Sequence, residues 1–96
     1  MLMPMWWQTF MSDPIFTNHL KCRWESLKQS IFNVNYLHNF IDSTVLTINN
    51  AQARNFQRWP VLGVDLFAQP WPLPANYTEE VDVLKTWISN RINWID

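Results

Sequence analysis

Residues 14–32 read PIFTNHLKCRWESLKQSIF, and this stretch indicates the kind of fold that the chain adopts. Apolar side chains recur in it at steps of four, four, three and four residues, at Phe16, Leu20, Trp24, Leu27 and Ile31. Because an α-helix turns once in about 3.6 residues, these side chains form one stripe along it. The stretch therefore predicts a helix over about 14–32 that packs through this stripe.

The start and the polar face of this helix support the same prediction. Asp13 is a favoured N-cap residue, and Pro14 after it suits the first helical position. Glu25 lies four residues after Lys21 and three residues before Lys28, so ion pairs can support the polar face.

The segment before this helix is unusually apolar for a chain end, which is commonly polar and frayed. It has the i, i+3, i+4 spacing of a short helix over about 5–11, carried by Trp6, Trp7, Phe10 and Met11. Because such bulky side chains need a partner surface, we expect that Met1 is not the true beginning of the folded unit.

A second long helix is predicted over about 36–58, after a short break at 33–35. Asn35 is the expected N-cap, and Pro60 ends the helix because it has no N–H to donate. Its stripe runs through Leu37, Ile41, Val45, Ile48, Gln52, Phe56 and Trp59, widened by Tyr36 and Phe40.

The middle of this second helix has a competing interpretation. Residues 44–48 include four β-branched side chains, which favour strands, so a short strand there stays open. If the helix is continuous, only a few residues join it to the helix over 14–32. Two helices with so short a connection are expected to form an antiparallel hairpin.

A final helix is predicted over about 78–95. With Thr78 as N-cap, Glu79 and Glu80 lie in the first turn, where the helix dipole favours carboxylates. The expected core stripe is Val81, Leu84, Ile88, Ile92 and Ile95, flanked by Trp87 and Trp94. Residues 76–78 also match the acceptor pattern for N-glycosylation, but turn and cap roles explain them better.

The segment between the last two helices reads PVLGVDLFAQPWPLPANY over 60–77, with four prolines and the only glycine of the chain. It is too long and too apolar for an ordinary solvated loop. We expect a strap that lies extended against another surface. The alternative is that PWPLP binds a partner that recognises polyproline conformation.

The composition limits the class of protein. Seven basic and eight acidic residues give a formal net charge of −1, which does not suit nucleic-acid binding through a basic stripe. No run approaches the roughly 18 apolar residues of a membrane span, and the first residues match a signal peptide poorly. The single cysteine, Cys22, cannot form an internal disulfide, so the compartment stays open. We expect one mainly α unit over 1–96.

No catalytic constellation is apparent. A single glycine excludes the glycine-rich phosphate-binding and nucleophile motifs. His38 and Asp42 are four residues apart and could orient a base or supply two metal ligands. Because no third group completes such a site, we expect a solvated or hydrogen-bonded pair, and an enzyme built on this pair is the weakest alternative. No catalytic, cofactor-binding or metal-binding residue is assigned.

Three segments resemble the spore-coat CotH kinase family, in the order that the family has them. WWQTFMSDPIFTNHLKCRWESLK, over 6–28, is similar to its Trp-rich helix, Asp-Pro-x-Phe turn and Arg-Trp-x-x-Leu helix. FIDSTVLTINNAQARNFQRWPVLG, over 40–63, resembles the next segment, with its Ala-x-x-Arg-Asn-Phe-x-x-Trp run. YTEEVDVLKTWISNRINWID, over 77–96, resembles the closing helix. The resemblance covers about residues 6–96.

This resemblance implies part of an atypical, Mg-ATP-dependent protein kinase that phosphorylates coat proteins or other secreted substrates. In the family, the nucleotide-binding lysine and the acidic catalytic and metal-binding residues precede the Trp-Trp segment. Asp42, Asp65 and Asp82 do not match those motifs, so the resemblance assigns no catalytic residue here. It implies that Trp6 and Trp7 are interior residues of a larger domain. It also implies that the protein belongs to the spore coat, is secreted or lies at the cell surface.

The resulting expectation is a C-terminal helical scaffold segment of a CotH-like kinase, inactive by itself. Its partner would be the missing N-terminal kinase-like portion or another protein, and Mg-ATP would bind outside this chain. The residues expected to matter for structure or interaction are Trp6, Trp7, Arg23, Trp24, Arg54, Phe56, Trp59, Trp87, Arg91 and Trp94. Arg54 and Arg58 precede Trp59 and are candidates for cation–π or carboxylate contacts across the bundle. The alternative is an autonomous helical module that binds a partner through its Trp- and Pro-rich surface.

Overall fold

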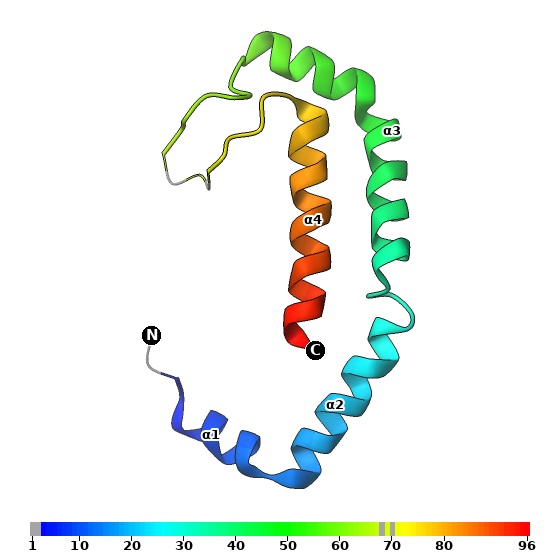
Figure 1. Ribbon diagram of the computed structural model, residues 1–96, viewed down its shortest axis with the longest axis vertical. Coiled ribbons are helices and arrows are strands. Elements are labelled where there is room, and N and C mark those ends of the chain that lie inside the picture. The colour runs from blue at the N-terminus through cyan, green and yellow to red at the C-terminus, as the bar shows by residue number, and fades with distance from the viewer. Residues whose placement is uncertain (1–2, 68, 70) are drawn as a thin grey trace. The chain divides into compact units, whose positions relative to one another are not determined.

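The computed structural model describes residues 3–67, 69 and 71–96, which form four α-helices and no strand (Figure 1). The helices are α1 (Met5–Ser12), α2 (Pro14–Lys28), α3 (Val34–Arg58) and α4 (Tyr77–Ile95). The prediction of a mainly α fold is confirmed. In the part of the chain that the structure covers, no helix is long and apolar enough to cross a membrane.

The chain divides into two compact units, Met1–Asn33 and Val34–Asp96. The first contains α1 and α2, and the second contains α3, the Pro- and Trp-rich strap and α4. The expected hairpin between the helices over 14–32 and 36–58 spans this division, so it stays a prediction. The single domain over 1–96 stays a prediction for the same reason.

The first unit begins as the sequence predicts. Asp13 has extended backbone between α1 and α2, and its Oδ1 accepts a hydrogen bond from the N–H of Ile15 at 2.9 Å. This bond caps α2, whose first residue is Pro14. The rings of Phe10 and Phe16 lie 5.1 Å apart and join α1 to α2.

The expected length of α2 is wrong, because the helix ends at Lys28 rather than near residue 32. The N–H groups of Ser30 and Phe32 both donate to the carbonyl of Leu27, at 3.1 and 2.8 Å, which tightens the chain into a turn. The hydroxyl of Ser30 donates to the carbonyl of Ser26 at 2.9 Å and competes with the helical ladder. Ile31 therefore leaves the apolar stripe and is exposed.

The second unit begins with α3, which starts at Val34. The prediction of Asn35 as N-cap is therefore wrong, because the preceding turn closes one residue earlier, with the N–H of Asn33 bonded to the carbonyl of Ser30 at 3.2 Å. The alternative of a strand over 44–48 is also wrong. The hydroxyls of Thr44 and Thr47 donate to carbonyls four residues back, at 2.9 and 3.0 Å, so the helix accommodates them.

The N-cap of α4 lies two residues before the expected one. Asn76, and not Thr78, is the N-cap, and its Oδ1 accepts from the N–H of Glu79 at 3.0 Å. Glu79 reaches back, and its Oε2 accepts from the N–H of Ala75 at 2.7 Å. The two bonds form a reciprocal pair close to a capping box, which the expected start at Thr78 would lack. Glu79 and Glu80 do lie in the first turn.

Within the second unit, α3 packs beside α4 (Figure 1). The half-buried apolar side chains at the contact are Leu37, Ile41 and Val45 of α3 and Val81 and Ile88 of α4. Ile92 of α4 is 6% exposed, and among the described residues it is the one buried side chain.

Several residues of the stripes predicted for the second unit are exposed instead, and they include Ile48 of α3, Trp59 directly after α3, and Leu84 and Ile95 of α4. The face of α4 that meets α3 is centred on Val81, Lys85, Ile88 and Ile92. A single neighbouring helix covers only a narrow stripe, so apolar side chains outside that stripe stay in solvent.

The strap connects α3 to α4 and packs only in part. Its Leu73 and Pro74 are half-buried and lie beside Glu79 and Val83 of α4, whereas Trp71 is 72% exposed. Gly63 has a φ of +74°, a conformation that glycine adopts without steric cost. The PWPLP motif begins at Pro70, which lies outside the described residues.

Candidate functional site

His38 and Asp42, the two candidate catalytic or metal-binding residues of the sequence, lie in the seam between α3 and α4. His38 and Asp42 project from successive turns of α3, and each contacts α4 rather than the other. Their partners are Lys85 and Ser89, which are also four residues apart. The seam therefore joins two matched pairs of polar residues across the two helices.

His38 contacts α4 through one ring nitrogen. Its Nε2 lies 3.1 Å from the carbonyl oxygen of Lys85 and 3.2 Å from Oγ of Ser89. Since a carbonyl can only accept, Nε2 carries the proton in this contact. The Ser89 hydroxyl in turn donates to the same carbonyl at 3.1 Å. This nitrogen is engaged in a helix–helix contact and is not positioned as a free base.

Asp42 forms an ion pair with Lys85, whose Nζ donates to Oδ1 of Asp42. The Lys85 side chain is only 21% exposed, whereas that of Asp42 is 55% exposed. A pair that is open to solvent on one side contributes about 0–1 kcal/mol to stability. His38 and Asp42 are hydrogen-bonded, as expected, but to partners on α4 rather than to each other.

An open groove of about 430 Å³ continues the seam toward the start of α4. Asp42, Val45 and Gln52 line it from α3, and Tyr77 and Asp82 line it from α4. The rings of Phe56 and Tyr77 lie 5.9 Å apart and hold the two helices together there. The part of the chain described here contains no group of three His, Cys, Asp or Glu side chains that could hold a metal ion.

The tryptophans named from the sequence are spread over both units. In the first unit, Trp6 contacts Trp7 and Phe10 at ring distances of 5.9 and 6.1 Å, and Trp24 contacts Phe32 at 6.0 Å. Trp24 is half-buried, while Trp6 and Trp7 are exposed. The first unit thus presents an aromatic surface formed by α1.

In the second unit, the arginines stack on neighbouring tryptophans. The guanidinium carbon of Arg58 lies 5.3 Å from the ring centre of Trp59, and that of Arg91 lies 4.4 Å from the ring centre of Trp94. Of the two candidates beside Trp59, the contact is made by Arg58 and not by Arg54. Phe56 is half-buried, whereas Trp59, Trp87 and Trp94 are exposed.

Sequence reasoning missed Lys85 and Ser89 as the partners of His38 and Asp42. The usable signal was the repeated i, i+4 spacing of polar residues directly beside two apolar stripes. Polar side chains at the border of such a stripe are expected to pair across the helix–helix contact. Arg23 is exposed on α2, and its predicted role stays untested.

A family model described as CotH kinase protein matches residues 3–95 of the 96-residue chain. Neither the curated proteins nor the solved structures contain a match to the chain.

Proposed function

Because the chain belongs to the CotH kinase protein family, we propose that it is the C-terminal helical scaffold segment of an atypical, Mg-ATP-dependent protein kinase. In this role it supplies packing surfaces to the nucleotide-binding portion and has no kinase activity by itself. Mg-ATP then binds to that other portion, and no residue of this chain is assigned to it.

The observation that carries this proposal is the exposure of the large apolar side chains. Ile92 alone is buried among the residues that the structure describes, while Trp6 and Trp7 of α1 and Trp59, directly after α3, are exposed. Burying one such side chain is worth about 1.5–3 kcal/mol, which is a large share of the stability of a small domain. Surfaces of this kind are typical of a segment that completes its core against another part of a larger domain.

The contacts of the two candidate catalytic residues also support a structural role. Nε2 of His38 is bonded to α4, and the Asp42 carboxylate is paired with Lys85. The contacts of both residues therefore join α3 to α4. The resemblance to the CotH kinase family points the same way, since its nucleotide-binding motifs precede the Trp-Trp segment.

The test is a urea titration of the 96-residue chain, followed by tryptophan emission at a submicromolar concentration. We expect a broad transition with long-wavelength emission. The apparent slope of the unfolding free energy against urea concentration should lie below roughly 1 kcal/mol/M, which is the lower end of the range for small cooperative domains. In the same preparation, incubation with Mg-ATP should leave the chain and an added acceptor protein unphosphorylated, as measured by mass spectrometry. Phosphoryl transfer by the purified chain would contradict the inactivity.

A sharp transition with blue-shifted native emission would instead favour the alternative, an autonomous module that binds a partner through its Trp- and Pro-rich surface. The exposed Trp71 of the strap is the observation that favours this alternative. Its partner would be a protein, since the net charge of −1 does not favour nucleic acid.

A further inference from the structure

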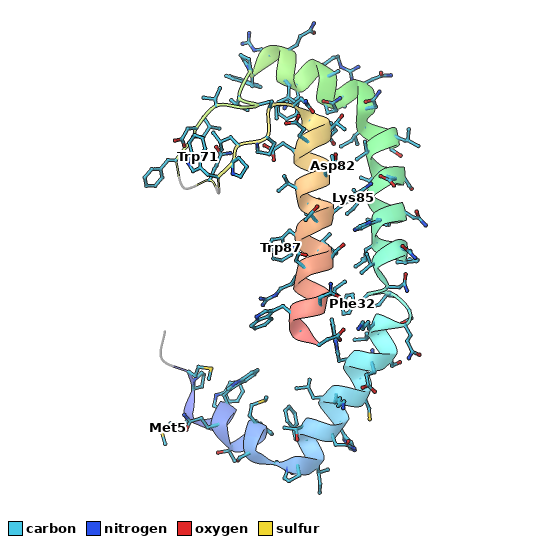
Figure 2. All side chains as sticks on the ribbon, viewed as in Figure 1. Met5, Phe32, Trp71, Asp82, Lys85 and Trp87 are labelled. Atoms are coloured by element: carbon cyan, nitrogen blue, oxygen red, sulfur yellow. The ribbon has the colours of Figure 1, made fainter. Side chains whose placement is uncertain are left out.

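One face of α4 has the residue spacing of a second helix–helix seam but no helix of its own unit against it. Glu80, Leu84, Trp87, Arg91 and Trp94 follow one another at steps of four, three, four and three. Side chains at this spacing lie on one face of a helix. Figure 2 shows Trp87 on the side of α4 away from α3, opposite Lys85. We call these five residues the outer face of α4.

The apolar members of the outer face are strongly exposed. Trp87 is 61% exposed, Trp94 is 74% exposed and Leu84 is 47% exposed. Val83 and Ile95 border the same face and are also exposed. The exposed surface of these apolar side chains, Val83, Leu84, Trp87, Trp94 and Ile95, is on the order of 500–600 Å² in one copy. A pair of copies could therefore bury about 1,000–1,200 Å², which is near the lower limit of specific interfaces.

The two charges of the outer face are opposite in sign and symmetrically placed. Glu80 and Arg91 are eleven residues apart, which is about three turns and about 16 Å along the helix axis. Leu84 and Trp87 lie between them, at equal distances from the midpoint. The face therefore has an acid at one end, a base at the other and apolar side chains in the middle.

Such a face is complementary to itself when a second copy lies antiparallel to it. A two-fold axis at the midpoint brings Glu80 of each copy against Arg91 of the other, and Leu84 against Trp87. The Glu80 carboxylate has no hydrogen bond or ion pair with any residue in the described ranges, and it is half-buried. Arg91 is held on this face by its contact with the ring of Trp94.

From this complementarity of charge we propose that the outer face of α4 binds the outer face of a second copy, forming an antiparallel homodimer. The ion pairs set the register and the orientation, and the apolar side chains supply most of the buried area. Because the area is small, the dimer is expected to be weak, with a dissociation constant of about micromolar or higher. The inference does not depend on the role proposed for the chain in a kinase.

The experiment uses charge reversal in the full 96-residue chain and measures the dimer dissociation constant by sedimentation equilibrium. Glu80→Arg places two arginines together at both ends of the dimer, and Arg91→Glu places two glutamates there. Each single variant should dimerise at least tenfold more weakly than the unchanged chain, since opposed like charges are strongly unfavourable. Asp82→Arg makes the same change of charge on α4 away from the outer face, and it should leave the dissociation constant within about threefold.

An equimolar mixture of the two single variants is the decisive sample. In a mixed dimer, the side chain introduced by Glu80→Arg in one copy faces the side chain introduced by Arg91→Glu in the other. At the opposite end, the unchanged Arg91 of the first copy faces the unchanged Glu80 of the second. Every contact then joins opposite charges, so association should return to within about threefold of the unchanged chain.

The double variant, with both charges exchanged, should recover in the same way. Recovery in the mixture also shows that the single variants kept their helix, which circular dichroism checks directly.

Three outcomes overturn the proposal: a chain that is monomeric up to about millimolar concentration, single variants that associate as the unchanged chain does, or a mixture that does not recover. In each of these cases the outer face is covered by something other than a second copy. The urea titration of the monomer at low concentration is unaffected by these outcomes, so this inference and the scaffold role can fail separately.

Discussion

Asn76 determines where α4 begins, although Thr78 has the side chain and the following glutamates of a typical cap. From position 76 the amide oxygen reaches the N–H of Glu79, and the Glu79 carboxylate can return to the N–H of Ala75. A start at Thr78 would leave these two N–H groups without those acceptors. Both residues are good caps by type, so only the backbone geometry distinguishes them.

The cap makes a prediction at this scale. Asn76→Ala should raise the exchange rate of the Glu79 amide about fivefold, which corresponds to a loss of about 1 kcal/mol from a missing cap. Thr78→Ala is the matched control and should change that rate less than twofold, because Thr78 lies inside the helix. Amide exchange followed by NMR measures both. Equal effects of the two substitutions would show that Thr78 also caps the helix.

At the scale of the element, residue spacing predicts which side of a helix is apolar, but it does not predict how many of those apolar side chains the neighbouring helix covers. Leu37, Ile41 and Val45 of α3 do face α4, as their spacing predicts. Leu84 and Ile95 belong to the same broad apolar pattern in α4, yet they are exposed. One helix covers a narrow part of another, and periodicity alone does not show which part.

The contact between α3 and α4 predicts an asymmetry between two isoleucines. Ile92→Val removes a methylene from the buried site and should destabilise the pair of helices by about 0.5–1.5 kcal/mol. Ile48→Val makes the same change at an exposed site of α3 and should cost much less, since little packing is lost. Exchange of the slowest amides in α3 and α4 reports both. A cost at residue 48 equal to that at residue 92 would contradict the observed burial.

At the scale of the whole molecule, the contacts divide the chain at Asn33 and Val34. The bonds of His38, the ion pair of Lys85 and the ring contact of Phe56 with Tyr77 all lie within Val34–Asp96. The contact of Phe10 with Phe16 lies within the first unit. Each unit therefore has its own set of stabilising contacts.

This division predicts that residues 34–96, produced alone, keep the contacts between α3 and α4. The pattern of amide protection in α3 and α4 should match that of the full chain, because the side chains that join the two helices are all present. Heteronuclear NMR of the two proteins under the same conditions makes the comparison. Loss of protection in the shorter protein would mean that the first unit is needed to hold α3 against α4.

The amino-acid sequence by itself determined the helical elements and most of their boundaries. Asp13 with Pro14, Pro60 after α3, and the spacing of apolar residues are local signals, and each acts within a few residues of the chain. The family resemblance also came from the sequence alone, through three segments in order, and the matched family agrees with it. The boundaries that were wrong, at Lys28, Val34 and Asn76, depend on hydrogen bonds to backbone groups that residue type does not specify.

The partners of the candidate site came only from the tertiary structure. His38 and Asp42 could have bonded to each other, to solvent or to a metal ion, and the packing of α3 on α4 placed Lys85 and Ser89 within reach. The same packing buries Ile92 and leaves the apolar side chains of the outer face of α4 exposed. The physical reason is that side chains more than forty residues apart meet through the orientation of whole helices, which no local spacing encodes.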